Sequence, residues 1–172
     1  MTSECGCPET YPDWHGQDIN LGGQPVHQLS IPMLLHMPLA YELYVQRQRQ
    51  ALDDLNLQQS WPGLHLTRTG LFRGSLTCLL EDRQSLSRHV SHLPYPFHIH
   101  GYLHHGNIST IRKSLRQVQM TLLDTGRMPK ELYLCHLTCP HCSEQRGGDK
   151  ILLLRRWQAS KMLAKKLEKQ QH

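Results

Sequence analysis

The sequence lacks long apolar runs, and phenylalanine is nearly absent. No stretch approaches the roughly 18 apolar residues of a membrane-spanning helix, so we expect no membrane span. Residues 1–8 show neither the basic segment nor the apolar core of a secretory signal, which predicts a cytoplasmic protein. Only two Phe occur, which argues against an RNA-binding module built on paired aromatic residues. The hydrolase patterns H-E-x-x-H and G-x-S-x-G are also missing.

What is present bounds the class of protein. The 172 residues are enough for one domain with its own hydrophobic core. The hydrophobic content of 38% is low but typical of a folded chain. A net charge of +5 permits a nucleic acid or another acidic or phosphorylated ligand as partner. Neither the substrate nor the oligomeric state can be deduced from these totals.

Hydrophobic patterning predicts an α+β single domain with a small mixed β-sheet, three main helices and a cysteine-bearing β-hairpin. Residues 1–37 are rich in turn formers, so we interpret them as an ordered N-terminal arm that wraps a globular body at 38–172. The predicted helices cover about 38–57, the segment from Asn107 to about 125, and the segment from about 158 onward. The predicted strands cover 64–69, 97–104, 131–138 and 150–157.

Two segments are less well defined. Residues 71–81 fit either a hairpin strand or a short helix capped by Ser75. Residues 82–96 are polar and broken by proline, which predicts a loop. In the first helix, Tyr41, Val45 and Leu52 can share an apolar face, and we expect Gln48 to lie largely outside it.

The cysteines carry the clearest chemical signal. In a reducing compartment paired cysteines more often bind metal than form structural disulfides. Cys139 and Cys142 form a C-x-x-C pair at the tip of the predicted hairpin, and Cys5 and Cys7 form a C-x-C pair near the N-terminus. Since tetrahedral zinc requires four ligands, we predict one structural Zn²⁺ held by both pairs, which ties the arm to the hairpin. Alternatives are mixed sites that use His136 or His141, and reduced cysteines without metal.

Cys139-Pro140-His141-Cys142 resembles the active-site tetrapeptide of the DsbA-type thioredoxin-fold oxidases over these four residues. The resemblance implies thiol redox chemistry, with the first cysteine activated at a helix N-terminus. Only seven residues, including a glycine pair, separate the tetrapeptide from the predicted strand at 150–157. No helix of useful length fits there, so we rank redox catalysis below metal binding. Cys78 and Cys135 are expected in the core.

Histidine is unusually frequent, with thirteen in the chain. In the strand segment 98–105, His98, His100 and His104 project from one face, as the ligands of a catalytic zinc or iron site would. This pattern supports an alternative function as a metal- or phosphate-dependent hydrolase or transferase. A strand whose polar face is simply solvated gives the same pattern.

The start of the following helix could bind an anion. Asn107 and Ser109 would present free N–H groups there, and Arg112 and Lys113 lie one turn further on. A second basic feature is the last helix, where Lys161, Lys165, Lys166 and Lys169 could follow a phosphate backbone. The leading hypothesis is therefore a cytoplasmic zinc-stabilised protein that binds an acidic ligand or nucleic acid; whether it is an enzyme stays open.

Overall fold

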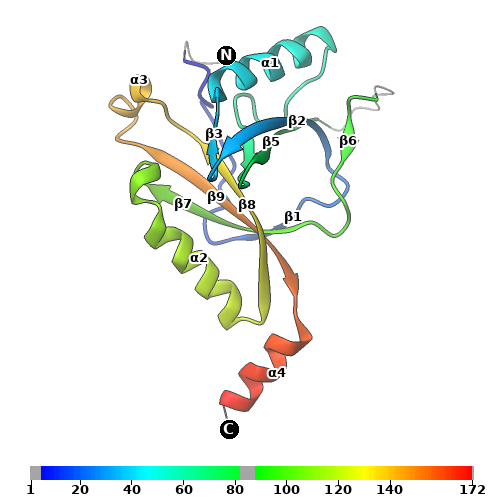
Figure 1. Ribbon diagram of the computed structural model, residues 1–172, viewed down its shortest axis with the longest axis vertical. Helices are drawn as coiled ribbons and strands as arrows, with labels where there is room; N and C mark the ends of the chain where they lie inside the picture. Colours follow the sequence, from blue (N-terminus) through cyan, green and yellow to red (C-terminus); the bar gives the residue numbers. More distant parts are fainter. Residues whose placement is uncertain (1–4, 82–87, 172) are drawn as a thin grey trace.

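The computed structural model describes residues 5–81 and 88–171, and a nine-stranded antiparallel sheet organises them (Figure 1). The strand order is β1-β7-β9-β8-β4-β5-β2-β3, with β6 paired to β2. The strands are β1 (Asp18–Asn20), β2 (Pro25–Leu34), β3 (Met37–Pro38), β4 (Leu66–Arg68), β5 (Arg73–Leu79), β6 (Ser91–His92), β7 (His98–His105), β8 (Arg127–His136) and β9 (Lys150–Ala159). The predicted α+β class is confirmed, and the sheet is larger than expected.

The three predicted main helices are present. The helices are α1 (Tyr41–Asp54), the 3₁₀ turn η1 (Ile108–Thr110), α2 (Arg112–Asp124), the single turn α3 (Pro140–Ser143) and α4 (Lys161–Gln170). Helix α1 starts three residues later than expected, because Pro38 pairs with Met33 in the edge ladder. Helix α4 begins after Ser160, whose side chain caps the Leu163 N–H at 3.3 Å.

Helices α1 and α2 cover the same face of the sheet, which we call the helix face. Residues paired across neighbouring strands point to the same face of a sheet, and Thr67 of β4 pairs with both Leu76 and Leu134. These three side chains therefore lie on the helix face. Leu76 packs in one cluster with Val45 of α1. Leu134 packs in another with residues around the start of α2.

Strands β7 and β8 run in the same direction, and α2 connects them. Strand β9 pairs antiparallel with both and lies between them. The β8–β9 ladder shifts register between Pro129 and Leu132. Proline has no N–H to donate, so an irregular ladder is expected beside Pro129.

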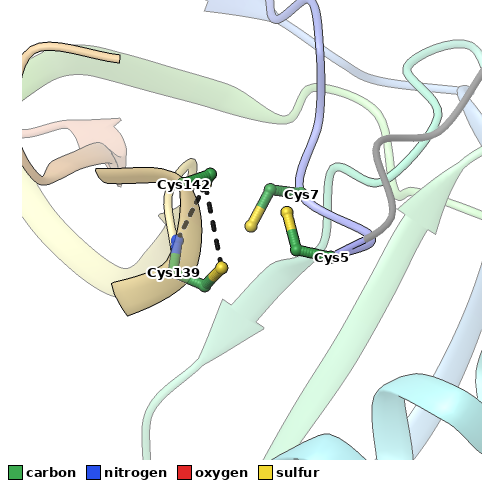
Figure 2. Close-up of side chains that lie close together, drawn as sticks. All are labelled: Cys5, Cys7, Cys139 and Cys142. Carbon is green, nitrogen blue, oxygen red and sulfur yellow. Dashed lines mark hydrogen bonds between the residues drawn. The ribbon is translucent and has the colours of Figure 1, made fainter. Parts of the chain in front are cut away.

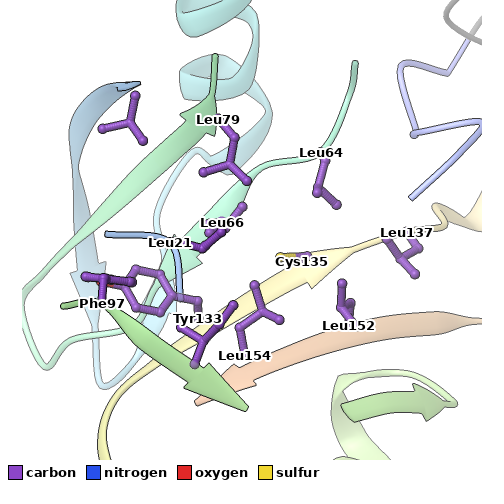
Figure 3. Close-up of a cluster of buried hydrophobic side chains, with 12 residues drawn as sticks. Leu21, Leu64, Leu66, Leu79, Phe97, Tyr133, Cys135, Leu137, Leu152 and Leu154 are labelled. Atoms are coloured by element: carbon purple, nitrogen blue, oxygen red, sulfur yellow. The ribbon is translucent and has the colours of Figure 1, made fainter. Parts of the chain in front are cut away.

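The opposite face of the sheet carries the largest hydrophobic core (Figure 3). Loop segments supply Leu21, Leu64 and Phe97 to it, in place of a helix. Its buried members are Leu21, Val26, Leu64, Leu66, Leu79, Phe97, Ile99, Tyr133, Cys135, Leu137, Leu152 and Leu154. The central strands β8 and β9 are therefore apolar on both faces.

The interpretation of residues 1–37 as a loop-like arm is wrong for 25–34. These residues form β2, which pairs with β5 over seven positions from Val26 to Pro32. The segment contains two prolines and several polar residues, so local patterning is weak and the strand depends on its partner. The division of the chain into an arm and a body stays a prediction.

Residues 73–79 resolve the predicted ambiguity in favour of a strand. They form β5, in which Ser75 pairs with Ser30 and Arg68 instead of capping a helix. The loop prediction for 82–96 falls partly on 82–87, outside the described residues. Among residues 5–81 and 88–171, no helix is long and apolar enough to cross a membrane.

Strand β1 is fixed to the rest of the protein by the contacts of the Asp18 carboxylate. The Asp18 carboxylate lies 2.9 Å from His100 Nδ1 and 2.5 Å from Arg127 Nη1. Partial burial raises the pKa of Asp18, but hydrogen bonds from Arg127 and His100 outweigh it and hold this pKa below its usual value.

Because the folded-state pKa of Asp18 is depressed, its carboxylate stabilises the fold above the unfolded pKa of about 3.9 and loses this effect as pH falls below it. We expect Asp18→Asn to lower the free energy of unfolding at neutral pH by less than about 1 kcal/mol, since the pair is partly exposed. At a pH of about 3 the deficit of the variant should be smaller than at neutral pH, because the stabilisation by the carboxylate is lost as pH falls toward the folded-state pKa. Urea unfolding at both pH values, with the exposed Asp13→Asn as control, measures this; a deficit of the same size at both pH values would contradict it.

Candidate metal centre

The tip of the β8–β9 hairpin positions two thiols. Beyond β8 the Leu137 N–H still donates to Lys150 O at 3.1 Å, and the chain then turns into α3. Cys139 is the N-cap of this turn, and its carbonyl accepts from the N–H groups of Cys142 and Ser143 at 3.1 and 3.0 Å. This turn places the side chains of Cys139 and Cys142 on one side of the hairpin tip (Figure 2).

The Cys5-Gly6-Cys7 turn lies against the same tip. Gly6 has a φ of +73°, which glycine adopts at little cost. Arg146, just beyond α3, donates from Nη1 to Pro8 O at 2.7 Å. Gly63 has a φ of +82°, and a Cβ there would lie 2.9 Å from Gly6 O. The loop before β4 and the hairpin tip therefore both fix the N-terminal segment.

Cys5, Cys7, Cys139 and Cys142, which we call the cysteine centre, come together in space although residues 8–138 separate the two pairs. Their four sulfur atoms all lie within 4.8 Å of one another (Figure 2). The Sγ atoms of Cys139 and Cys142 are 3.7 Å apart. Four sulfurs at the vertices of a tetrahedron around Zn²⁺ would be about 3.8 Å apart, given Zn–S bonds of about 2.3 Å. The cysteine centre therefore fits a metal ion.

The surroundings of the cysteine centre disfavour ionisation of its thiols. Burial, followed by hydrogen bonds with the other three cysteines, raises the pKa of the Cys7 thiol. Burial likewise raises the pKa of Cys142. Four sulfurs so close together disfavour one another's ionisation, and a divalent cation between them removes this penalty.

Cys78 and Cys135 lie elsewhere, in the core, as predicted. Both are completely buried, and burial raises the pKa of each thiol. Cys78 Sγ donates to Gln48 Oε1 at 3.1 Å.

The redox chemistry that the tetrapeptide implies requires a helix that starts at Cys139 and lowers the pKa of its thiol, and α3 is too short for this. Cys139 does stand at a helix N-terminus, but α3 has four residues and ends at Ser143. One turn adds little dipole to lower the pKa of a thiol. The ranking of metal binding above redox catalysis is consistent with this geometry.

The histidines of β7 have separate partners. The His98 ring stacks on Trp157 with centroids 4.6 Å apart, and His100 binds Asp18. His104 Nδ1 lies 2.7 Å from Ser114 Oγ. Within 5–81 and 88–171, the cysteine centre is the group of three or more potential ligands that converges, and these histidines are not in it. Their catalytic role stays a prediction.

The predicted anion site has an internal hydrogen bond that engages one of its N–H groups. Asn107 Oδ1 accepts from the Ser109 N–H at 3.0 Å and from Ser109 Oγ at 2.5 Å. One N–H group expected to bind an anion is therefore already engaged. Arg112 and Lys113 are exposed on the first turn of α2. An anion-binding role of these four residues stays a prediction.

A feature that sequence reasoning missed lies beside the cysteine centre. A pocket of about 430 Å³ opens on the helix face, between α1 and the ends of β4 and β8. Gln48 of α1 contacts His65 of the pocket wall and is completely buried, so the expectation that it lies outside the apolar face is wrong. The spacing of Val45, Gln48 and Leu52, three and four residues apart, places all three on one face and could have revealed this.

Comparisons with known proteins show the fold alone. No protein-family model matches the chain, and no curated protein does. Among solved structures, the chain is similar to the crystal structure of the EcmrR C-terminal domain, with a TM-score of 0.60 and 8% identity. The alignment covers 83% of this chain and 96% of that one. At this identity, the similarity extends to the arrangement of strands and helices.

Proposed function

We propose that the cysteine centre holds one structural Zn²⁺ and that the protein acts by binding an acidic ligand. The observation that carries the metal proposal is the convergence of four sulfurs from opposite ends of the chain within 4.8 Å. Four thiolates complete the tetrahedral shell of zinc and leave no position for a substrate, as in structural sites. Thiolate ligands also require a reducing compartment, so we place the protein in the cytoplasm.

In this proposal, zinc joins the N-terminal segment to the β8–β9 hairpin. The segment before β1 contains no helix or strand among its described residues. Its order would then depend on the metal, on the Arg146 hydrogen bond and on packing against Gly63. Metal analysis of protein purified without added metal tests this: we expect one zinc per chain, and metal-free folded protein would overturn it.

The acidic ligand is proposed to lie on α4. This helix has no buried residue and extends from the end of β9, away from the sheet (Figure 1). Its four lysines are all exposed: Lys161, Lys165, Lys166 and Lys169. Together with the chain's net charge of +5, this surface favours a phosphate backbone, and so we propose nucleic acid as the ligand.

Nucleic-acid titration at two salt concentrations checks this binding function. We expect measurable affinity for single-stranded or duplex DNA at low salt, decreasing as salt rises, because each neutralised phosphate releases counterions. Replacing Lys165, Lys166 and Lys169 together by glutamine should reduce the slope of log K against log salt by up to about 3. Arg73→Gln, which removes a charge at the start of β5, is the control and should leave the slope unchanged. No affinity at low salt would refute the proposal.

A further inference from the structure

The wall of the pocket beside the cysteine centre contains aromatic and titratable side chains. Tyr41 of α1 and His136 of β8 form an edge-to-face pair, with ring centroids 5.8 Å apart and an interplanar angle of 67°. His65, just before β4, lines the pocket together with Glu42 and Arg49 of α1. The volume of about 430 Å³ is in the range of small-molecule sites.

The orientation of Gln48 is fixed by backbone carbonyls. Its Nε2 donates to His27 O at 3.1 Å and to Leu76 O at 3.0 Å. Both acceptors require the nitrogen of the amide, so the oxygen must face the other way. Oε1 therefore points toward His65, whose Nδ1 lies 2.8 Å away.

This orientation determines the tautomer of His65. Gln48 Oε1 can only accept, so at 2.8 Å it favours the tautomer in which His65 Nδ1 carries the hydrogen and donates it. The Cys78 thiol lies 3.2 Å from Nδ1 and donates to the same oxygen at 3.1 Å. His65 is 6% exposed, and burial lowers its pKa to about 4, so the ring is neutral at neutral pH. Nε2, on the edge of the ring opposite Nδ1, is then a bare acceptor. Among the described residues, the contacts of His65 with Gln48 and Cys78 both use Nδ1.

His65 lines an open pocket, and Nε2 is the ring nitrogen that is still able to accept a hydrogen bond. The remaining charges disfavour an anion. A zinc ion with four thiolates carries a net negative charge, and Glu42 adds another. The positive group, Arg49, lies over Gly6 between the two N-terminal cysteines: a Cβ on Gly6 would be 2.2 Å from its Nη2. Arg49 therefore offsets the charge of the thiolates first.

We propose that this pocket binds a small planar molecule with N–H donors, such as an amidine or an amino-substituted nitrogen ring, whose N–H donates to His65 Nε2. Because the rings of Tyr41 and His136 are inclined at 67°, the ligand stacks its flat face on one of them and meets the other at its edge, and its positive or neutral charge suits Glu42. The proposal rests on the proposed zinc site in one respect, because the metal holds the segment that contributes Cys5 and Cys7 to the wall.

Benzamidine and benzoate form a matched pair of probes, because they have the same planar shape and differ in N–H donors and charge. Calorimetric titration of the full chain should show binding of benzamidine and of the neutral probe adenine. Benzoate should bind about tenfold more weakly or not at all, because it cannot donate to Nε2. If benzoate binds as well as benzamidine, Arg49 controls the pocket and the proposal is overturned.

The variant His65→Asn separates the two edges of the ring. Its amide N–H can replace Nδ1 toward Gln48, but it has no acceptor in the place of Nε2. Both donor probes should bind about three- to tenfold more weakly. His36→Asn is the control: His36 is exposed in the β2–β3 turn at a φ of +67°, which asparagine tolerates, and affinity should not change. Equal loss in both variants, or none in His65→Asn, overturns the role of Nε2.

A second variant does not touch the buried network. Gln46→Trp adds bulk from an exposed position on α1 that lines the pocket and should abolish binding of both probes. Zinc content is measured in every sample. If neither probe binds zinc-loaded protein, the pocket proposal fails and the zinc site stands. If the folded protein as purified contains no zinc and still binds the probes, the zinc proposal fails and the pocket stands; if it contains no zinc and binds neither probe, both fail.

Discussion

Replacing Cys142 by serine is expected to remove the metal and to lower the midpoint of thermal unfolding markedly. A ligand that binds only the folded state stabilises it by about 4 kcal/mol when its free concentration is roughly a thousand times the Kd. For a chain of this length that corresponds to about 8–16 °C in the midpoint. Differential scanning calorimetry with metal analysis of the same samples measures both effects.

Cys135→Ala is the matched control for this variant. Cys135 is completely buried in β8, four residues before Cys139, and is not in the cysteine centre. Its loss should cost stability through packing but leave one zinc per chain. A Cys142→Ser protein that keeps its zinc in the presence of a chelator would contradict the proposed ligand set.

Replacing Leu154 by alanine is expected to destabilise the fold by about 2–5 kcal/mol, because it opens a cavity in the main core. Leu154 is completely buried on β9 and faces Tyr133 and Phe97 of the same cluster (Figure 3). Leu43→Ala is the matched control, since Leu43 is 46% exposed on α1 and alanine favours helix.

Denaturant unfolding of both variants measures the difference. The Leu43 variant should stay within about 0.5 kcal/mol of the wild type. A Leu154 variant of wild-type stability would contradict the assignment of β9 as a strand buried on both faces.

The central part of the fold could be predicted from sequence because its signals are local. Ile151 to Leu154 is a continuous apolar run, and β9 buries one pair of its side chains against α2 and the other in the main core. The helix predicted from Asn107 starts with the turn η1, which the Asn107 side chain caps and which leads into α2. Each of these signals lies within one segment and needs no partner to be recognised.

What escaped prediction depends on contacts between distant segments. Strand β2 is defined by its pairing with β5, not by its own alternation. Gln48 is buried because the carbonyls of His27 and Leu76 accept its two N–H bonds. The spacing of Gln48 relative to Val45 and Leu52 places it on the buried face of α1, although its polarity suggests exposure. Such a residue can be recognised as buried and hydrogen-bonded only if its spacing is preferred to its polarity as the criterion.

The cysteine centre lies between these cases. Cysteine chemistry and the requirement for four ligands were enough to select the two pairs, because Cys78 and Cys135 stand alone in apolar segments. Their convergence depends on the whole sheet, on Gly63 and on Arg146, none of which carries a metal signal of its own.

X-ray absorption spectroscopy at the zinc edge, on protein purified without added metal, tests the central proposal most directly. The proposal predicts that the spectrum shows one zinc per chain, with four sulfur atoms bound to it at about 2.3 Å and no nitrogen or oxygen ligand. A shell containing histidine nitrogen would move the metal away from the cysteine centre. Absence of zinc from the folded, reduced protein would contradict the account outright.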